Sequence, residues 1–285
     1  MPAIKELLAD HSLFSSETAR LDLELLLCAV LGKSRSFLFA WPEYELAEGE
    51  HGEFERLRAE RESGVPVAYL LGEREFWSLT FAVNAHVLIP RPETELLVEV
   101  ALALQLESAG SDHPNQSLRV ADLGTGSGAV AIAIAKERPS WSITAVDASA
   151  AALAIAKTNA DRHSVDTVKF FQGCWFEPIE EQRFSLVLSN PPYIAESDPH
   201  LARGDVRFEP RMALTPGASG MEAINVLVET APLHLVSGGF LFFEHGHEQG
   251  AASRSLLASR GFEHVVTHKD AAGLERVSGG CWTSS

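Results

Sequence analysis

The chain has 285 residues, enough for one large domain or for a medium domain plus a small one, and its 46% hydrophobic and 22% charged residues are ordinary for a globular protein. The formal net charge of −16 argues against nucleic acid as a direct partner, because proteins that bind nucleic acid backbones usually carry a basic face. The three cysteines have no paired spacing, and no apolar run approaches the roughly 20 residues of a membrane span, so we expect a cytoplasmic protein with no disulfide framework and no membrane partner.

The N-terminal part of the sequence is typical of a small helical module. Residues 17–32 place leucines at helical spacing and end at Gly32, a suitable C-cap. Residues 48–64 form a second amphipathic pattern, which ends at Gly64. We assign residues 1–75 to this module, whose size lies in the range where independent stability is marginal.

The pattern then changes to that of a β-hairpin. Residues 77–83 alternate like a strand, and a second short extended run over residues 86–89 follows a turn at Asn84. We interpret residues 76–90 as a two-stranded hairpin that links two domains.

Residues 91–106 predict a helix that opens the second domain, which we assign to residues 91–285. Pro92 lies near the first turn of this helix, where proline is tolerated. Arg91 and Glu93 either cap the helix or border a pocket. The polar stretch 108–117 is the strongest internal boundary signal.

Strands and helices alternate over the rest of the chain. The predicted strands cover residues 118–124, 142–149, 168–173, 184–190, 238–246, 263–270 and 275–280. The predicted helices cover residues 128–139, 151–164, 220–236 and 249–261. This alternation predicts an α/β fold, a doubly wound, mainly parallel, seven-stranded Rossmann-like sheet with ligands beyond the carboxyl ends of its strands.

A glycine-rich turn joins the first of these strands to its helix. Gly124, Gly126 and Gly128 allow the backbone to approach a ligand closely, and the helix presents free N–H groups. Asp122 precedes the glycines. Asp147 ends the next strand, where it can accept hydrogen bonds from both hydroxyls of a ribose.

The spacing of the glycines distinguishes between cofactors. A dinucleotide fingerprint reads G-x-G-x-x-G, with a pyrophosphate at the helix N-terminus. Here the spacing is G-x-G-x-G after Asp122, which would repel a pyrophosphate but suits a cationic amino-acid ligand. S-adenosyl-L-methionine (SAM) has a ribose, a sulfonium and an α-ammonium group and no phosphate. The turn therefore favours SAM over a purely structural role.

The predicted strand 184–190 ends in the sequence Asn190-Pro191-Pro192-Tyr193. Two prolines remove two backbone donors and fix two φ angles, so the strand must end there. In an open parallel sheet this turn faces the same crevice as the glycine-rich turn. The Asn190 side-chain oxygen and the Pro191 carbonyl can each accept a hydrogen bond, and Tyr193 offers a flat ring. The turn can therefore hold a planar NH₂ group.

An NH₂ group of this kind is a poor nucleophile, because its lone pair is delocalised. Two acceptors localise that lone pair and aim it at the sulfonium methyl, so positioning and desolvation supply most of the acceleration without a strong general base. The two turns together predict methylation of an amide or of an exocyclic amine. A simple strand terminator is the alternative for the second turn, and the neighbouring cofactor turn disfavours it.

Several further stretches extend this pattern along the chain. They are GEREFW, LIPRPETE, VADLGTGSGAVAIAIA, AVD, SNPPYI, HLARGDVRFEP and EHGHEQG. Together they resemble the PrmC/HemK family, the glutamine-N5 methyltransferases of peptide chain release factors, over nearly the whole chain. Asn-Pro-Pro-Tyr is shared with adenine-N6 methyltransferases, whereas IPRPETE combined with GDVRFEP is far more specific.

The resemblance implies methyl transfer from SAM to the glutamine side-chain nitrogen of the release factor's Gly-Gly-Gln motif, with S-adenosyl-L-homocysteine as product and translation termination as the process supported. It implies that Asp147 lies on the ribose, Trp175 beside the adenine, and that the N-terminal module contacts the release factor. The expected cofactor contacts are Asp122, Gly124, Thr125, Gly126, Ser127, Gly128, Asp147, Trp175 and Asn190. The expected substrate contacts are Asn190, Pro191, Pro192 and Tyr193, of which Asn190, Pro191 and Tyr193 are the catalytic set. We expect a monomer.

Two other functions are compatible with parts of the sequence. A nucleic acid adenine-N6 methyltransferase uses the same acceptor turn on a flipped base. The net charge, the lack of a basic recognition stretch and the lack of an inserted target-recognition domain argue against it. A SAM-binding regulatory protein without catalysis would have no need of the intact acceptor turn.

The sequence departs from the family pattern at a few positions. Cys174 replaces the acid that usually precedes the tryptophan, so the family's contact with the adenine amino group is expected there from the backbone and not from the side chain. The Cys174 thiol lacks an activating base. His247 stands where tryptophan is common, and the loop in KDAAGLERVSGG varies. Glu244, His245 and His247 form no further ligand cluster, so we expect no metal.

Overall fold

A computed structural model describes residues 1–9, 18–104 and 118–283. The chain divides into two compact units. Residues 1–73 and 202–208 form the first unit, and residues 74–201 and 209–285 form the second. The segment 202–208 therefore packs with the N-terminal helices, although no sequence pattern indicated this. The predicted boundary loop at 108–117 lies outside the described residues.

The first unit is helical, and its two predicted helices are confirmed. Its elements are α1 (Ile4–Ala9), α2 (Ala19–Leu31), α3 (Arg35–Ala40), α4 (Glu48–Glu62), α5 (Val67–Leu71) and the 3₁₀ helix η4 (Asp205–Phe208). Leu23 and Leu27 of α2 pack with Phe54 of α4 in one buried cluster. Gly32 ends α2 in the left-handed conformation, with φ 60°, as its predicted C-cap role requires.

A buried ion-pair cluster joins η4 to the N-terminal helices. Arg61 of α4 donates to Asp22 of α2 at 2.8 Å and to Asp205 of η4 at 2.8 Å. Arg207 adds a bond from its guanidinium to the carbonyl of Ser63. Because Arg61 and Asp22 are both buried, each needs the other to compensate its lost hydration.

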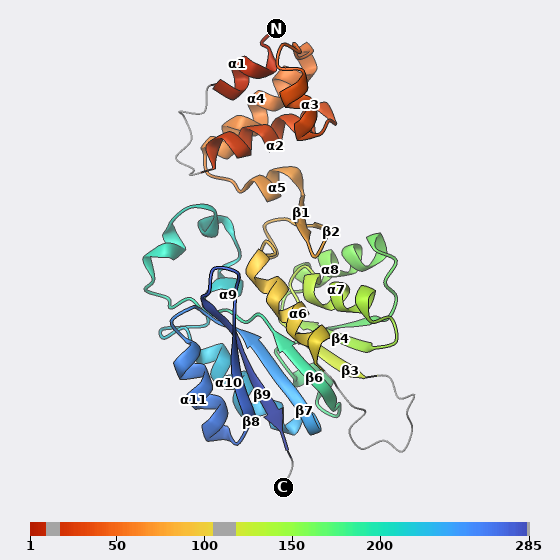
Figure 1. Cartoon of the computed structure of the whole chain (residues 1–285), viewed down its shortest axis with the longest axis vertical. Coiled ribbons are helices and arrows are strands. Elements are labelled where there is room, and N and C mark those ends of the chain that lie inside the picture. Colours follow the sequence, from red (N-terminus) through yellow and green to blue (C-terminus); the bar gives the residue numbers. More distant parts are fainter. Residues whose placement is uncertain (10–17, 105–117, 284–285) are drawn as a thin grey trace. The chain divides into compact units, whose positions relative to one another are not determined.

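The second unit is a seven-stranded sheet with helices on both faces (Figure 1). The strands are β3 (Arg119–Leu123), β4 (Ser142–Asp147), β5 (Val168–Gln172), β6 (Phe184–Ser189), β7 (Leu235–Glu244), β8 (Glu263–Lys269) and β9 (Glu275–Trp282). Their order is β5-β4-β3-β6-β7-β9-β8, in which β9 runs antiparallel to β7 and to β8 and the other neighbouring pairs are parallel. The predicted fold class and its strands are confirmed.

Alternate residues of the central strands enter two separate cores. Val120 of β3 packs against α7 (Ala129–Glu137) and α6 (Glu95–Ala103). Ala121 and Leu123, on the other face, pack against the remaining helices. Those helices are α10 (Glu222–Thr230) and α11 (Gly250–Arg260), while α8 (Ala150–Arg162) lies beside α7 on the first face. Burial on both faces explains why these strands read as continuous apolar runs.

The predicted hairpin exists, and the predicted strand over 77–83 contains one of its strands, but the second predicted strand, over 86–89, is wrong. The hairpin strands are β1 (Glu73–Phe76) and β2 (Leu79–Ala82), and residues 86–89 form no strand. Trp77 and Ser78 form the two-residue turn, with φ 52° and 55°. Positive φ at both positions matches a type I′ turn. Such turns normally carry Asn-Gly, so the sequence Trp77-Ser78 did not indicate a turn here. The Trp77 backbone N–H and ring N–H donate to Glu95 and Glu137, which helps hold this turn.

Two predicted helices differ at their ends. The helix predicted from residue 91 begins as the 3₁₀ turn η1 (Pro92–Thr94) before α6, and its last two predicted residues lie outside the described ones. The helix predicted over 220–236 ends at Thr230 and continues as the 3₁₀ turn η5 (Ala231–Leu233). Pro232 lacks the backbone N–H that an α-helix would need there.

Between β6 and α10 the chain forms only short elements, which the sequence did not predict. They are η3 (Pro199–Ala202), η4 and α9 (Arg211–Leu214), and η2 (Glu177–Ile179) similarly precedes β6. Among the described residues, no helix combines the length and apolarity needed to cross a membrane.

Candidate functional site

The site lies where the strand order changes direction, between β3 and β6. These strands are parallel neighbours, and Leu123 at the end of β3 pairs with Ser189 at the end of β6. The Ser189 hydroxyl donates to the Leu123 carbonyl at 2.7 Å and is fully buried. The glycine-rich turn and the Asn-Pro-Pro-Tyr turn therefore leave the sheet side by side, at the position where open α/β sheets bind ligands.

The glycine-rich turn has the backbone shape that its sequence requires. Gly124, Gly126 and Gly128 have φ values of 73°, 57° and 82°. The N–H groups of Gly124 and Thr125 donate to the Val146 carbonyl of β4, which anchors the turn to the sheet.

The same turn leaves space that a side chain would fill. A Cβ atom on Gly124 would lie 3.8 Å from the ring of Trp175 and 4.0 Å from the Asn190 carbonyl, and one on Gly126 would meet no atom within 4 Å. A Cβ on Gly128 would instead press on α8, at 3.2 Å from Ala156. The first two glycines keep the cavity open, and the third allows two helices to pack closely.

Asp122 is a buried acid at the floor of the cavity. It accepts a bond from the Thr125 hydroxyl at 2.6 Å. Burial raises the pKa of Asp122 to about 6, which the Thr125 bond partly opposes and the charge of Asp147 reinforces. An acid that is largely ionised at neutral pH and little hydrated is a strong partner for a cationic group.

Asp147 ends β4 and holds two backbone N–H groups. Its two carboxylate oxygens accept from Gly126 and Ser149, each at 2.8 Å. Burial raises the pKa of Asp147, and these two bonds oppose the shift. Each carboxylate oxygen retains a second lone pair, so both can still accept from a diol.

Trp175 and Cys174 line the cavity beyond β5. Trp175 adopts φ 50°, an uncommon conformation for an aromatic residue, and its ring also packs against the second core cluster. Cys174 is exposed, and its backbone N–H donates to Glu177 at 3.3 Å.

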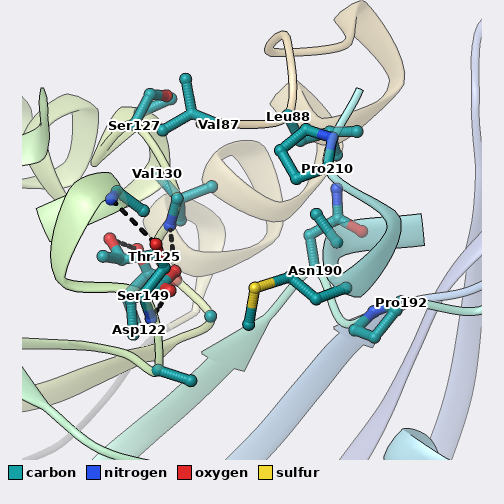
Figure 2. Close-up of a pocket in the computed structure, with 18 of the residues that line it drawn as sticks. Val87, Leu88, Asp122, Thr125, Ser127, Val130, Ser149, Asn190, Pro192 and Pro210 are labelled. Atoms are coloured by element: carbon teal, nitrogen blue, oxygen red, sulfur yellow. Dashed lines mark hydrogen bonds between the residues drawn. The ribbon is translucent and has the colours of Figure 1, made fainter. Parts of the chain in front are cut away.

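The Asn-Pro-Pro-Tyr turn contributes unequally to the cavity. Figure 2 shows Asn190 and Pro192 on one side of the cavity, across from Asp122 and Thr125. Among the described residues that line the cavity, Pro191 and Tyr193 are absent. The Tyr193 hydroxyl instead donates inward to Glu244 at 2.9 Å, and burial together with the Glu244 charge raises the pKa of Tyr193.

The structure brings the predicted cofactor residues together in one cavity, with one exception. The lining residues include Asp122, Gly124, Thr125, Gly126, Ser127, Asp147, Trp175 and Asn190. Gly128 is not among the lining residues, and its role is the helix packing described above. Arg91 lines the cavity and forms an ion pair with buried Glu209, so it is a pocket residue.

Several buried or half-buried polar residues that support the site were not predicted. Thr94 accepts from the Asn190 side-chain amide at 3.0 Å and donates to Glu244 at 2.6 Å. Gln249 donates to the Tyr193 carbonyl at 3.0 Å, and Glu209 accepts from the Ile89 N–H at 3.1 Å. The motif strings contained these residues, but only the fold brings them to the acceptor turn.

The histidines near β7 have structural contacts. The ring nitrogens of His245 bond to the Gly246 carbonyl and the Ser278 hydroxyl, both at 2.8 Å. The ring of His247 lies 3.8 Å from the Glu248 carboxylate at the surface. The described residues hold no group of three or more His, Cys, Asp or Glu side chains that could bind a metal ion.

Two protein families match the chain. Residues 3–72 match the PrmC N-terminal domain, and residues 100–205 match the methyltransferase small domain. Among solved structures, a methyltransferase from Pyrococcus furiosus shares the fold, with a TM-score of 0.54 and 16% identity over 81% of this chain and 100% of that chain.

Curated relatives match almost end to end. The release factor glutamine methyltransferase of Pseudomonas aeruginosa is 48% identical over 282 residues, covering 99% of both chains. The protein of the same name from Shewanella oneidensis is 45% identical over 94% of this chain and 91% of its own. The chain therefore belongs to the release factor glutamine methyltransferase family.

Proposed function

We propose that this protein transfers a methyl group from SAM to the side-chain nitrogen (N5) of the glutamine in the Gly-Gly-Gln motif of peptide chain release factors. The observation that carries the proposal is the placement of Asn190, at the carboxyl end of β6, in the same cavity as the glycine-rich turn after β3. An acceptor for an amide N–H thus lies beside a nucleoside site.

The residues present fit SAM. Gly124 and Gly126 open space for the ligand, Asp147 can accept from the ribose hydroxyls, and Trp175 offers a ring for the adenine. Asp122 supplies the negative charge that a cationic methionine group needs. When bound, SAM supplies an electrophilic methyl on a sulfonium.

The protein's contribution to the reaction is to orient and desolvate the nucleophile. The Asn190 side-chain oxygen and the Pro191 carbonyl accept the two N–H groups of the glutamine amide, which localises its lone pair on nitrogen. Neither Pro191 nor Tyr193 is among the described residues that line the cavity itself, so the proposal places the glutamine amide at the edge of the cavity, against the turn, with the ring of Tyr193 bordering the amide plane. Reaction then depends on alignment with the methyl group, and the proton leaves after the nitrogen has acquired positive charge.

The release factor is the proposed protein partner, and the N-terminal module over residues 1–75 contacts it away from the reacting glutamine. The relatives' names support the substrate class. The net charge of −16 supports the absence of a direct nucleic acid partner. We further propose a cytoplasmic monomer.

The test is transfer of labelled methyl from SAM to a purified bacterial release factor. We expect label on the intact factor and none when the Gly-Gly-Gln glutamine is replaced by alanine. Bulk DNA and RNA serve as competing substrates. Label on nucleic acid instead would mean that Asn190 holds an adenine, and the proposal would fail.

A further inference from the structure

A buried carboxyl group connects the two ends of the acceptor turn without lining the cavity. Glu244 ends β7 and is 1% exposed. One of its oxygens accepts from the Thr94 hydroxyl at 2.6 Å, and the other accepts from the Tyr193 hydroxyl at 2.9 Å. Thr94 in turn accepts from the Asn190 side-chain nitrogen at 3.0 Å. The chain of bonds thus runs from Asn190 through Thr94 and Glu244 to Tyr193.

The direction of these bonds determines which atom of Asn190 faces a ligand. A hydroxyl has one proton, and Thr94 gives it to Glu244. Toward Asn190, Thr94 can therefore only accept, so it selects the NH₂ end of that amide. The carbonyl oxygen of Asn190 remains as the polar atom that can accept from a substrate N–H. With the opposite orientation, Asn190 would present a donor, and a substrate NH₂ group would keep only the Pro191 carbonyl as an acceptor.

We propose that Glu244 and Thr94 are positioning residues for methyl transfer, which set the amide orientation of Asn190 and, through the Tyr193 hydroxyl, the ring at the other end of the turn. The inference rests on the proposed function, because it assumes an NH₂ group as the substrate. It assigns a role in the reaction to Thr94, which lines the cavity, and to Glu244, which does not.

The groups around Glu244 act on its charge in opposite directions, and the geometry of its two hydrogen bonds is what shows it as an acceptor on both oxygens. Burial raises the pKa of Glu244, while the bonds from Thr94 and Tyr193 and the positive charge of Arg276 oppose the shift. Glu93 is the other carboxylate that acts on it, and it raises the pKa. Arg276 is itself held by Asp270 at 3.0 Å.

The backbone of the turn is fixed independently of Glu244. Gln249 donates to the Tyr193 carbonyl at 3.0 Å, and Ser189 anchors the end of β6 at 2.7 Å. Loss of the Thr94 hydroxyl should therefore leave the turn in place and remove only the control of the Asn190 amide. This separation makes the proposal testable without unfolding the site.

The experiment compares Thr94→Val with Thr94→Ser and with Thr144→Val in the full-length protein. Valine matches threonine in shape but lacks the hydroxyl, serine restores it, and Thr144 is a buried threonine of β4 that does not line the cavity. Single-turnover methyl transfer to a release factor and SAM affinity by calorimetry are measured for each. We expect Thr94→Val to slow transfer by about 10- to 100-fold, below the roughly 100- to 1,000-fold that loss of a direct transition-state contact costs. Thr94→Ser should stay within about threefold of the wild type, and SAM affinity should change by less than about twofold in all variants.

The outcomes separate the two proposals. If the wild type methylates the release factor and Thr94→Val is as fast as Thr144→Val, the positioning role is overturned and the proposed function stands. If Thr94→Val loses SAM affinity in proportion to its rate, Thr94 is merely structural, and the positioning role again fails. If the wild type itself transfers no methyl to the release factor, the proposed function fails at that step.

A second measurement uses Glu244→Gln. An amide offers one acceptor and one donor, so it cannot accept from both Thr94 and Tyr193, and Asn190 can then adopt either orientation. We expect transfer to slow by about tenfold in the wild-type background but by less than about threefold in the Thr94→Val background, because neighbours in one network are not additive. Additive losses would show that Glu244 does not act through Thr94.

Discussion

At the scale of single residues, the buried acid Asp122 leads to a testable dependence of SAM affinity on pH. Asp122 combines complete burial with a raised pKa of about 6 and faces the side of the cavity assigned to the methionine part of SAM. Because the folded acid binds its proton more readily than a free one, lowering the pH through 6 removes a negative charge from the site. We expect SAM affinity to be constant above about pH 7 and to fall as the pH drops below 6.

Asp122→Asn provides the control for this pH dependence. Asparagine cannot ionise, so its SAM affinity should be low at every pH and nearly flat between pH 5 and 8, apart from the titration of other groups such as Asp147, whose pKa is also raised. Calorimetric titration at several pH values checks both proteins. An equally steep fall in Asp122→Asn would assign the pH dependence elsewhere.

Gly126 and Gly273 form a matched pair for the role of the cofactor turn. Both have positive φ, at 57° and 81°, and a Cβ on either would meet nothing within 4 Å. Alanine at either position should therefore reduce the free energy of unfolding by about 1 to 2 kcal/mol through backbone strain alone. Only Gly126→Ala also places a methyl in the SAM cavity, so we expect it to weaken SAM binding about tenfold or more while Gly273→Ala does not.

At the scale of elements, η4 is held to the N-terminal helices by Arg61. Replacing Arg61 by leucine leaves Asp22 buried without a countercharge, which should reduce the free energy of unfolding of the first unit by about 3 to 5 kcal/mol. Asp205→Asn, at a side chain that is 41% exposed, should reduce it by less than about 1 kcal/mol.

Limited trypsin digestion checks this prediction together with thermal unfolding. Arg203 and Arg207 are the cleavage sites in this segment, and the Arg207 guanidinium bonds to the Ser63 carbonyl. We expect faster cleavage there in Arg61→Leu than in Asp205→Asn. Equal resistance in both variants would mean that other contacts hold η4 in place.

The hairpin of β1 and β2 shows where local sequence rules fail to predict an element. The type I′ turn at Trp77–Ser78 lacks the usual Asn-Gly, so alternation alone placed the hairpin strands too late in the chain. Glu95 and Glu137, which bind Trp77, come from α6 and α7, far along the sequence. The turn conformation is therefore stabilised by tertiary contacts that no local pattern contains.

At the scale of the whole molecule, the residues that line the cavity all belong to the second unit. In contrast, η4 belongs to the first unit, although in the sequence it lies between two segments of the second. Removing residues 1–73 should therefore leave SAM affinity within about threefold of the full-length value. Transfer to an intact release factor should fall much further, because the proposed contact surface is lost and η4 loses Arg61.

Calorimetry and methyl transfer measured on the same truncated preparation check this expectation. A short peptide that carries Gly-Gly-Gln serves as the control substrate, since it needs no contact with the N-terminal module. If truncation affects the peptide and the intact factor equally, the N-terminal module has no role in recognising the partner.

The sequence by itself determined the α/β fold, the glycine-rich cofactor turn and the Asn-Pro-Pro-Tyr turn. These features are local: apolar runs of strand length, positive φ at Gly124 and Gly126, and two prolines that end β6 all act within a few residues. Parallel strands also bring their carboxyl ends to one edge, so the meeting of the two turns followed from topology alone.

Only the tertiary structure decided how the acceptor turn is held. Thr94 lies 96 residues before Asn190, and Glu244 lies 51 residues after Tyr193, so no periodicity relates them. Their hydrogen bonds exist because η1 leads into α6, which packs against β7, the neighbour of β6, and burial there requires every polar group to find a partner. The tertiary structure also decided that the Tyr193 hydroxyl bonds to Glu244 and not to a group in the cavity. The buried carboxyl of Glu244 needs hydrogen-bond donors, and only folding brings them within reach.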